Sequence, residues 1–104
     1  MNLKPQTILK KSLTNYHKSF SKPKREQNKQ KLIQVIQLIF DNQISYLITN
    51  HKAHKLRGIY AGCWSCHIRG DWILIWKWTG NILELVDTGT HNSIPGYIKE
   101  NYDV

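Results

Sequence analysis

The chain has 104 residues, of which 40% are hydrophobic, and a formal net charge of +8 with a sequence pI of about 9.7. This length suits one compact domain over residues 1–104, the apolar share excludes general disorder, and the positive charge favours a polyanionic partner. No apolar run approaches the roughly 18 residues that a membrane span needs, and no apolar signal-peptide core follows Lys4, so we expect a cytoplasmic protein with no membrane association.

The net positive charge lies in the first third of the chain. Residues 1–31 hold a single acid, Glu26, and nine basic residues, which are Lys4, Lys10, Lys11, Lys18, Lys22, Lys24, Arg25, Lys29 and Lys31. A helix that is merely solvated, which is the alternative, would carry interleaved acids for ion pairs three or four residues apart. We therefore expect this basic face to bind RNA phosphates, with contacts from Lys18, Lys22, Lys24, Arg25 and Lys29.

Two helices are predicted in the front half. Over residues 7–20, apolar side chains recur at a spacing compatible with a helix. The recurrence at three and four is clearer over residues 24–41, and Pro23 stands near the first turn of that segment. Residues 19–23 would be the break between two antiparallel helices, whereas residues 44–54 are assigned to no element.

Three strands are predicted in the second half, over residues 59–68, 72–78 and 82–88. Arg69-Gly70 and residues 79–81 supply the turn chemistry between them, so the strands would form an antiparallel meander. The middle strand is apolar on both faces and is expected to be central and covered. The predicted fold class is α+β, with two N-terminal helices packed on a small antiparallel β-sheet.

Residues 63–67 read Cys-Trp-Ser-Cys-His, which matches the pattern for covalent haem attachment and part of a zinc pattern. Haem attachment of this kind belongs to exported proteins, and the sequence shows no export signal. On a strand Cys63 and Cys66 would face opposite ways, and a zinc site would need a further ligand, such as His51 or His54, at no recognised spacing. We expect two half-buried thiols, with no metal and no cofactor.

Three histidines and one acid are the candidate catalytic residues. His54, His67 and His91 accompany Asp71 in the strand-rich half, and such groups handle protons at neutral pH without a metal when they lie together. Residues two or four positions apart on a strand share a face, which favours the pairing of His67 with Asp71. The alternative is a set of dispersed surface histidines.

The four tryptophans are Trp64, Trp72, Trp76 and Trp78. An indole stacks on any base, because every base offers a π-face. A domain of this size also needs large side chains to fill its interior, so we expect most of them in the core. Base stacking is expected only of the one that borders the histidines.

Three blocks of the sequence resemble the YafQ branch of the RelE/ParE toxin superfamily. They are residues 54–58 (HKLRG), 67–76 (HIRGDWILIW) and 88–91 (TGTH). The resemblance implies a RelE-like fold and a toxin that cuts messenger RNA in the ribosomal A site and is silenced by a cognate antitoxin. The family's active-site histidines fall on His54, His67 and His91, and its acid and neighbouring aromatic residue fall on Asp71 and Trp72.

Two positions depart from the family pattern. The family commonly has arginine immediately before TGTH, where this chain has Asp87. It also tends to have an aromatic residue four positions after the last histidine, where this chain has Pro95, with Tyr97 two residues further on as a possible substitute.

The chemistry of RNA cleavage shows why the arginine matters. Attack of the 2′-hydroxyl on the adjacent phosphorus needs a base, here Asp71 or His67, and an acid for the 5′-oxygen, here His91. It also needs positive charge on the phosphorane, which an arginine supplies and Asp87 cannot. Restoring the arginine at position 87 is thus expected to raise cleavage, unless Asp87 points away or another cation acts in its place. The candidates are Arg57, Arg69, Lys55 and Lys77.

The sequence therefore predicts a ribosome-dependent mRNA endoribonuclease toxin that works by metal-independent acid-base catalysis and binds an antitoxin. A member that binds antitoxin or RNA and cuts poorly, because of Asp87, is the alternative. A third interpretation, a gyrase-directed toxin of the ParE kind, has no need of proton-transfer groups, and the histidine set argues against it.

Overall fold

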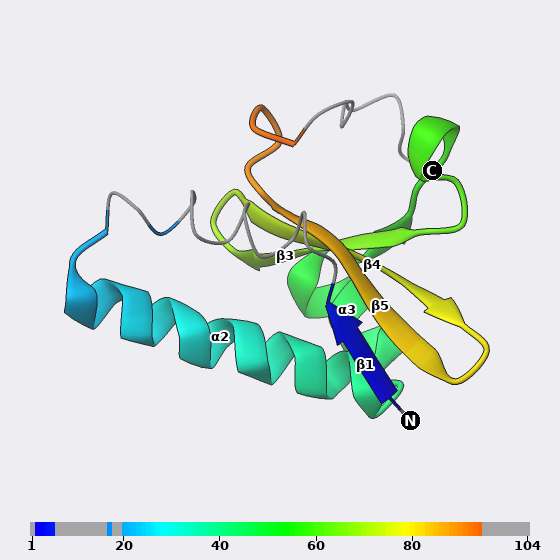
Figure 1. Cartoon of the computed structure of the whole chain (residues 1–104), viewed down its shortest axis with the longest axis horizontal. Helices are drawn as coiled ribbons and strands as arrows, with labels where there is room; N and C mark the ends of the chain where they lie inside the picture. Colours follow the sequence, from blue (N-terminus) through cyan, green and yellow to red (C-terminus); the bar gives the residue numbers. More distant parts are fainter. Residues whose placement is uncertain (1, 6–16, 18–19, 95–104) are drawn as a thin grey trace.

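The computed structural model of the protein describes residues 2–5, 17 and 20–94. The helices α2 (Lys22–Phe40) and α3 (Ile44–His51) accompany a sheet and a short 3-10 helix, η1 (Gly58–Tyr60). The strands are β1 (Asn2–Pro5), β2 (His54–Lys55), β3 (Trp64–Arg69), β4 (Trp72–Thr79) and β5 (Ile82–Gly89) (Figure 1). None of the helices described here has the length and apolar character needed to cross a membrane.

The strands form one sheet in the order β1-β5-β4-β3-β2. β3, β4 and β5 form the predicted antiparallel meander with the apolar strand β4 central, and β2, which was not predicted, pairs antiparallel with β3. β1 was not predicted, and it pairs with β5 in parallel, so the sheet is mixed rather than purely antiparallel. A segment of four residues is too short to show an alternating pattern, which is why no sequence signal indicates it.

α2 confirms the second predicted helix. Pro23 lies in its first turn, where a missing N–H costs nothing, and Val35 and Ile39 are buried on its inner face. Asn42, with a φ of 56°, ends the helix in the left-handed region. The first predicted helix, over residues 7–20, lies outside the described residues except for His17 and Phe20.

Two segments of the fold differ from the sequence-based assignment. Residues 44–51, which had no assignment, form α3, whose Leu47 is buried in the core. The strand predicted over residues 59–68 is wrong in its first half, because the chain forms η1 and enters β3 only at Trp64. Gly58 and Gly62 adopt φ values of 73° and 89°, which turn the chain and interrupt an extended strand.

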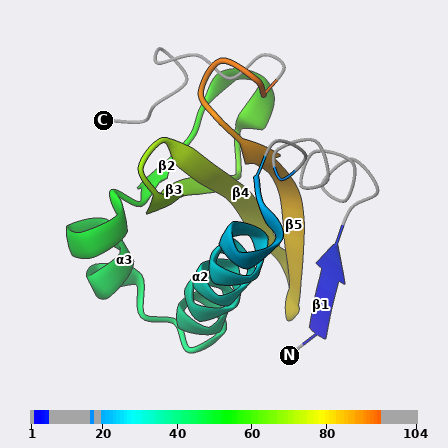
Figure 2. The same ribbon diagram turned by 90° about the vertical axis from the view of Figure 1, so that its left-hand side faces the viewer.

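The sheet has an apolar cluster on each face. α2 and α3 cover one face, where the core includes Val35, Leu47 and Trp76 (Figure 2). We call this the helix side. On the other face, which we call the open side, a smaller cluster contains Leu56, Cys63, Ile73, Ile75 and Ile94.

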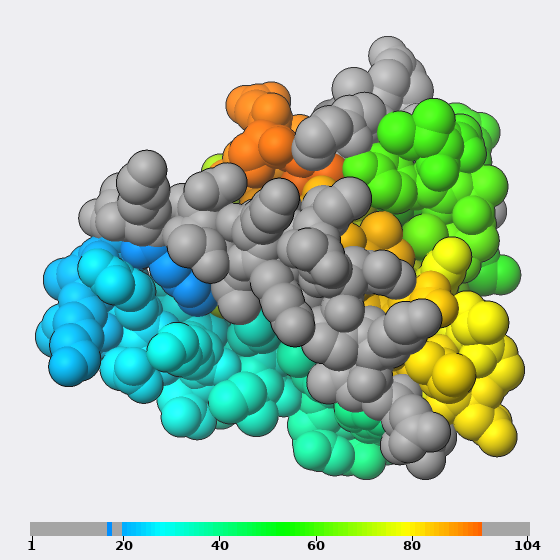
Figure 3. All heavy atoms as spheres, in the orientation of Figure 1, coloured from blue at the N-terminus to red at the C-terminus, as the bar shows by residue number. Residues whose placement is uncertain are grey.

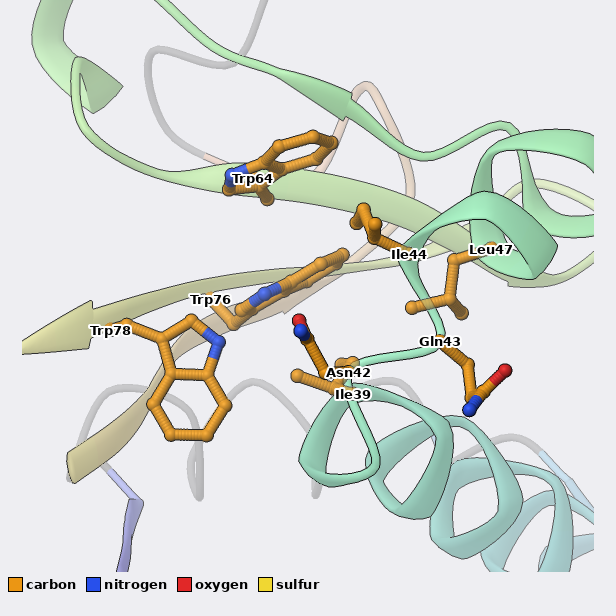
Figure 4. Close-up of a pocket in the computed structure, with 8 residues that line it drawn as sticks. All are labelled: Ile39, Asn42, Gln43, Ile44, Leu47, Trp64, Trp76 and Trp78. Carbon is orange, nitrogen blue, oxygen red and sulfur yellow. The ribbon is translucent and has the colours of Figure 1, made fainter. Parts of the chain in front are cut away.

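A pocket of about 180 Å³ lies on the helix side, where the α2–α3 connection meets the sheet. Figure 4 shows three indoles in its wall, together with Ile39, Asn42, Gln43, Ile44 and Leu47. Trp64 and Trp76 stack with ring centroids 6.3 Å apart, and Trp78 contacts Phe40 edge to face. These tryptophans belong to the packing between the helices and the sheet, as expected of most of them.

Candidate active site

Strand register places the histidines of β2 and β3 on the open side. His54 pairs with Ser65, Ser65 with Ile75, and His67 with Ile73. Opposite residues on neighbouring strands share a face, and Ile73 and Ile75 belong to the open-side cluster. His54 and His67 therefore lie on the face opposite α2 and α3.

The turn after β5 carries His91 to the same place. Its imidazole lies 5.2 Å from that of His67, measured between ring centroids. The Ser93 hydroxyl accepts the Thr90 N–H at 2.8 Å, and the buried Ile94 anchors the turn in the open-side cluster. This turn, orange in Figure 3, lies at the surface of the molecule, and the side chains of His54, His67 and His91 are each half-buried.

Gly89 makes that turn possible. Its φ is 154°, and a Cβ at this position would lie 2.5 Å from the Ser93 hydroxyl oxygen, which is closer than a carbon atom can approach. There is therefore a steric reason why the TGTH block has glycine at this position. It lets the chain fold back so that His91 faces His67.

Backbone carbonyls orient two of the histidines. The His67 Nδ1–H donates to the Gly70 carbonyl at 2.8 Å, and the His54 Nδ1–H donates to the Lys52 carbonyl at 2.7 Å. A carbonyl oxygen only accepts, so each bond keeps the proton on Nδ1. In the neutral ring Nε2 then carries the lone pair, which suits a general base.

The charges that act on His91 come largely from the residues of the predicted cluster. Burial is the main cause that lowers the pKa of His91 below 6.5, and the charges of His67, His54 and Lys52 lower the pKa further. The carboxylate of Asp71, at the exposed β3–β4 turn, acts in the opposite direction. The structure thus brings together His54, His67, Asp71 and His91, while their catalytic roles stay predictions.

Trp72 requires a correction. It is fully buried on the helix side, its indole N–H donates to the Thr88 hydroxyl at 2.7 Å, and its ring contacts His17 edge to face with a centroid distance of 5.4 Å. A side chain with no exposed surface cannot stack on a base. The predicted RNA contact of Trp72 is therefore wrong, and its role is to join the sheet to the helix side.

Asp87 lies on the open side but inside the protein. It pairs with Ile75, only 3% of its surface is exposed, and one of its carboxylate oxygens accepts the Thr88 N–H at 2.8 Å. Its charge also raises the pKa of Tyr60, after burial, which is the larger cause. Among the described groups whose charges act on His91, Asp87 is absent. The carboxylate is thus turned inward, and the cation of the family pattern is missing from this position.

Three of the four candidate replacement cations are engaged elsewhere. Arg69 lies opposite Trp72, beyond an irregularity in β3, and donates across the helix side to the buried Asn28 of α2 at 3.4 Å. The Lys55 ammonium lies 5.8 Å from the centroid of the Trp64 ring. Lys77 pairs with Glu84 at 3.5 Å. Arg57, the fourth, is exposed immediately before η1.

The predicted basic face lies along the start of α2. Lys22, Arg25 and Lys29 are exposed and Lys24 is half-buried, whereas Lys18 is outside the described residues. The Arg25 Nε–H donates to the Phe20 carbonyl at 2.8 Å, and Lys29 forms a surface ion pair with Glu26 at 3.5 Å. A surface ion pair of this kind contributes little to stability, so Lys29, like Arg25, stays available to phosphates.

The cysteines face opposite sides of the sheet, as predicted, although both are buried rather than half-buried. Cys66 lies in the helix-side core and Cys63 in the open-side cluster. Burial raises the pKa of Cys66 to about 12. In the part of the chain that the structure describes, no group of three His, Cys, Asp or Glu side chains is arranged to hold a metal ion.

Sequence reasoning missed two residues at the edge of the site. The His51 Nδ1–H donates to the His67 carbonyl at 2.8 Å and so ties the end of α3 to β3. Lys52 follows at once in the chain, and its charge acts on His91. The sequence around Lys52 and His54 gives no sign of the His51–His67 hydrogen bond or of the effect of Lys52 on His91, because both depend on where α3 ends.

Comparison with known proteins identifies the family. The sequence profile described as "Bacterial toxin of type II toxin-antitoxin system, YafQ" matches residues 2–96. The mRNA interferase toxin YafQ of Escherichia coli strain K12 is 36% identical over 73 residues, which cover 70% of this chain and 78% of that protein.

Solved structures agree with this match. The crystal structure of YafQ from E. coli strain BL21(DE3) has a TM-score of 0.74 at 25% identity, and the match covers 91% of this chain and 98% of that one. A chain of the E. coli DinJ-YafQ toxin-antitoxin complex has a TM-score of 0.72 at 27% identity, with 91% and 97% covered. Sequence and fold together show that this chain belongs to the YafQ family of bacterial toxins from type II toxin-antitoxin systems.

Proposed function

We propose that the protein is a cytoplasmic, ribosome-dependent endoribonuclease that cuts messenger RNA by acid-base catalysis without a metal and is neutralised by an antitoxin. The observation that carries this proposal is the pair of imidazoles of His67 and His91, 5.2 Å apart on the open side. Its family membership supports it as well, because the E. coli relative is named an mRNA interferase.

In the proposed reaction, the ribose 2′-hydroxyl attacks the adjacent phosphorus and the 5′-oxygen leaves. His67 accepts the 2′-hydroxyl proton on Nε2, since its Nδ1–H is held by the Gly70 carbonyl. Asp71 is the other candidate for this base. Protonated His91 donates its proton to the leaving 5′-oxygen, so the two imidazoles have complementary protonation states.

The lowered pKa of His91 makes its protonated form a stronger acid but a rarer one at neutral pH. A bound phosphate places negative charge beside the ring, which raises the pKa of His91 again. The protonated fraction of His91 therefore increases when the substrate is present. The higher protonated fraction of His91 in the substrate complex favours proton donation to the leaving 5′-oxygen.

The partners follow from the charge distribution and from the relatives. The exposed cations of α2 would contact ribosomal RNA phosphates while the open side receives the message. The E. coli relative forms a complex with DinJ, which supports an antitoxin partner for this chain.

The first experiment separates cleavage from binding. His91→Ala should lower the cleavage of ribosome-bound message by about 100-fold or more, the usual scale for a positioned acid, with ribosome binding nearly unchanged. Asn92→Ala, in the same exposed turn, is the matched control and should cleave normally. A wild-type protein that cuts no message with or without ribosomes would contradict the proposal.

Asp87 favours a second candidate function, which is binding without efficient cleavage. The buried carboxylate supplies no positive charge where the family pattern has arginine. Wild-type protein that binds ribosomes and antitoxin but does not cut message in the same assay would support this alternative.

A further inference from the structure

Lys52 has a fixed backbone at the edge of the candidate site. It follows α3 with a φ of 53°, in the left-handed region, and the next N–H, that of Ala53, donates to the Leu47 carbonyl at 3.1 Å. Its own carbonyl accepts the His54 Nδ1–H at 2.7 Å. The main chain of Lys52 is therefore held from both sides, by the end of the helix and by a candidate catalytic histidine.

The side chain of Lys52 is exposed, and its charge acts on His91. The other described charges that act on His91 belong to His67, Asp71 and His54, so Lys52 is the one lysine or arginine among them. An ammonium group keeps its charge at neutral pH, whereas an imidazole in general is only partly protonated there. Lys52 thus gives this side of the protein a permanent positive charge.

The reaction requires such a charge. Two negative charges develop on the non-bridging oxygens of the phosphorane, and a fixed cation beside them lowers the barrier. Asp87 points inward, and Arg69, Lys55 and Lys77 have partners away from the histidines.

We propose that the Lys52 ammonium group contacts a non-bridging oxygen of the scissile phosphate and supplies the positive charge that position 87 lacks. This role rests on the proposed nuclease function. The carbonyl of Lys52 itself orients His54, so the cation and the histidine would move as one unit. The flexible ammonium group acts as a point charge rather than as a two-pronged clamp.

Cleavage of ribosome-bound message tests the catalytic part. Lys52→Asn removes the charge but suits the left-handed backbone, so it should fold normally and cut about 10- to 100-fold more slowly, with the loss in kcat. Lys52→Arg should retain most of the activity. Lys55→Asn removes a nearby lysine that lies over Trp64, and is the matched control. A Lys52→Asn variant that cuts at the wild-type rate would overturn the proposal.

A second measurement needs no cleavage. NMR titration of the His91 ring should give a higher pKa in Lys52→Asn than in the wild type, because a repelling cation is gone, and an unchanged pKa in Lys55→Asn. Adding inorganic phosphate should raise the pKa of His91 in the wild type, and less so in Lys52→Asn.

These outcomes separate the two proposals. If the wild type cuts no RNA but its phosphate response depends on Lys52, the nuclease function fails and the anion-binding role of Lys52 remains. If Lys52→Asn responds to phosphate as the wild type does, the inference about Lys52 is wrong whether or not the wild type cleaves.

Discussion

At the scale of single residues, backbone carbonyls orient the imidazoles of three histidines. The Nδ1–H groups of His51, His54 and His67 donate to the carbonyls of His67, Lys52 and Gly70. Lys52 follows the end of α3 and Gly70 lies in the β3–β4 turn, whereas His67 lies within β3 just before its irregularity. The site therefore uses main-chain acceptors to select the tautomer of its side chains.

Burial changes the expected effect of restoring arginine at position 87. Asp87→Arg removes the acceptor of the Thr88 N–H and places a cation where 3% of the residue is exposed. We expect the free energy of unfolding to fall by about 2 to 4 kcal/mol. Asp87→Asn keeps an acceptor oxygen and should lose about 1 kcal/mol or less.

Urea unfolding measures both values for position 87. Asp41→Asn is the control, because Asp41 is exposed at the end of α2, and it should stay within about 0.5 kcal/mol of the wild type. An Asp87→Arg protein as stable as the wild type and faster in cleavage would show that position 87 reaches the RNA.

At the scale of elements, α2 has two functions. Val35 and Ile39 are buried against the sheet, while the first two turns present cations to solvent. Asn28, also in the first two turns, is fully buried and accepts a hydrogen bond from Arg69 of β3. This contact places the Arg69 guanidinium beside α2 and extends its basic face across the sheet edge.

The basic face predicts a strong salt dependence. Replacing Lys22, Arg25 and Lys29 together with Gln should weaken ribosome binding and flatten the slope of log affinity against log salt, by about 0.9 for each phosphate of duplex-like RNA that is no longer neutralised. Lys77→Gln is a control from the other side of the sheet, where Lys77 pairs with Glu84. Equal slopes for the wild type and the triple variant would mean that α2 does not bind phosphates.

At the scale of the whole molecule, the sheet separates packing from chemistry. The helix side holds the larger core and the tryptophans, whereas the open side holds the histidines above a small apolar cluster. The residues of one strand serve both tasks by alternation, as Cys66 and His67 do on β3. A mutation can therefore affect the site without entering the main core.

Apolar pattern predicted α2 and β4, because apolar residues recur at three and four along α2 and β4 is a nearly continuous apolar run. It missed α3, whose ends are set by left-handed residues at Asn42 and Lys52, and it extended β3 too far because Gly58 and Gly62 turn the chain. These features depend on backbone conformations that an apolar pattern does not reveal. The apolar pattern was therefore informative for long elements and uninformative at their boundaries.

The candidate site was partly predictable for a similar reason. Residue type and the YafQ motifs selected His54, His67, Asp71 and His91, which the sheet register and the two turns bring together. The inward turn of Asp87 and the direction of Arg69 depend on side-chain packing, which no motif encodes. Lys52 was missed because its position depends on the end of α3.

The stability of the whole protein should depend on two histidines with lowered pKa values. Burial lowers the pKa of His17 most, followed by the charges of Lys29 and Arg25, and burial likewise is the main cause for His91. The unfolded chain, with histidines near 6.5, therefore takes up these protons before the folded protein does as the pH falls. Stability should be highest above this value and decrease as the pH falls through 6.5 toward the folded-state pKa values.

Urea unfolding at about pH 7.5, 6.5 and 5.5 would measure this dependence, in a range where most carboxylates remain ionised. Replacing either histidine with Gln removes one differential protonation, so His17→Gln and His91→Gln should each reduce the loss of stability between the highest and the lowest pH. The comparison uses the change in the free energy of unfolding with pH, so a variant that is less stable at every pH remains informative. Asn92→Ala should keep the wild-type slope, because it leaves both histidines in place. If the wild type is equally stable at all three values, the folded protein must bind these protons as readily as the unfolded chain, and the burial of His17 against Trp72 would then have no effect on its protonation.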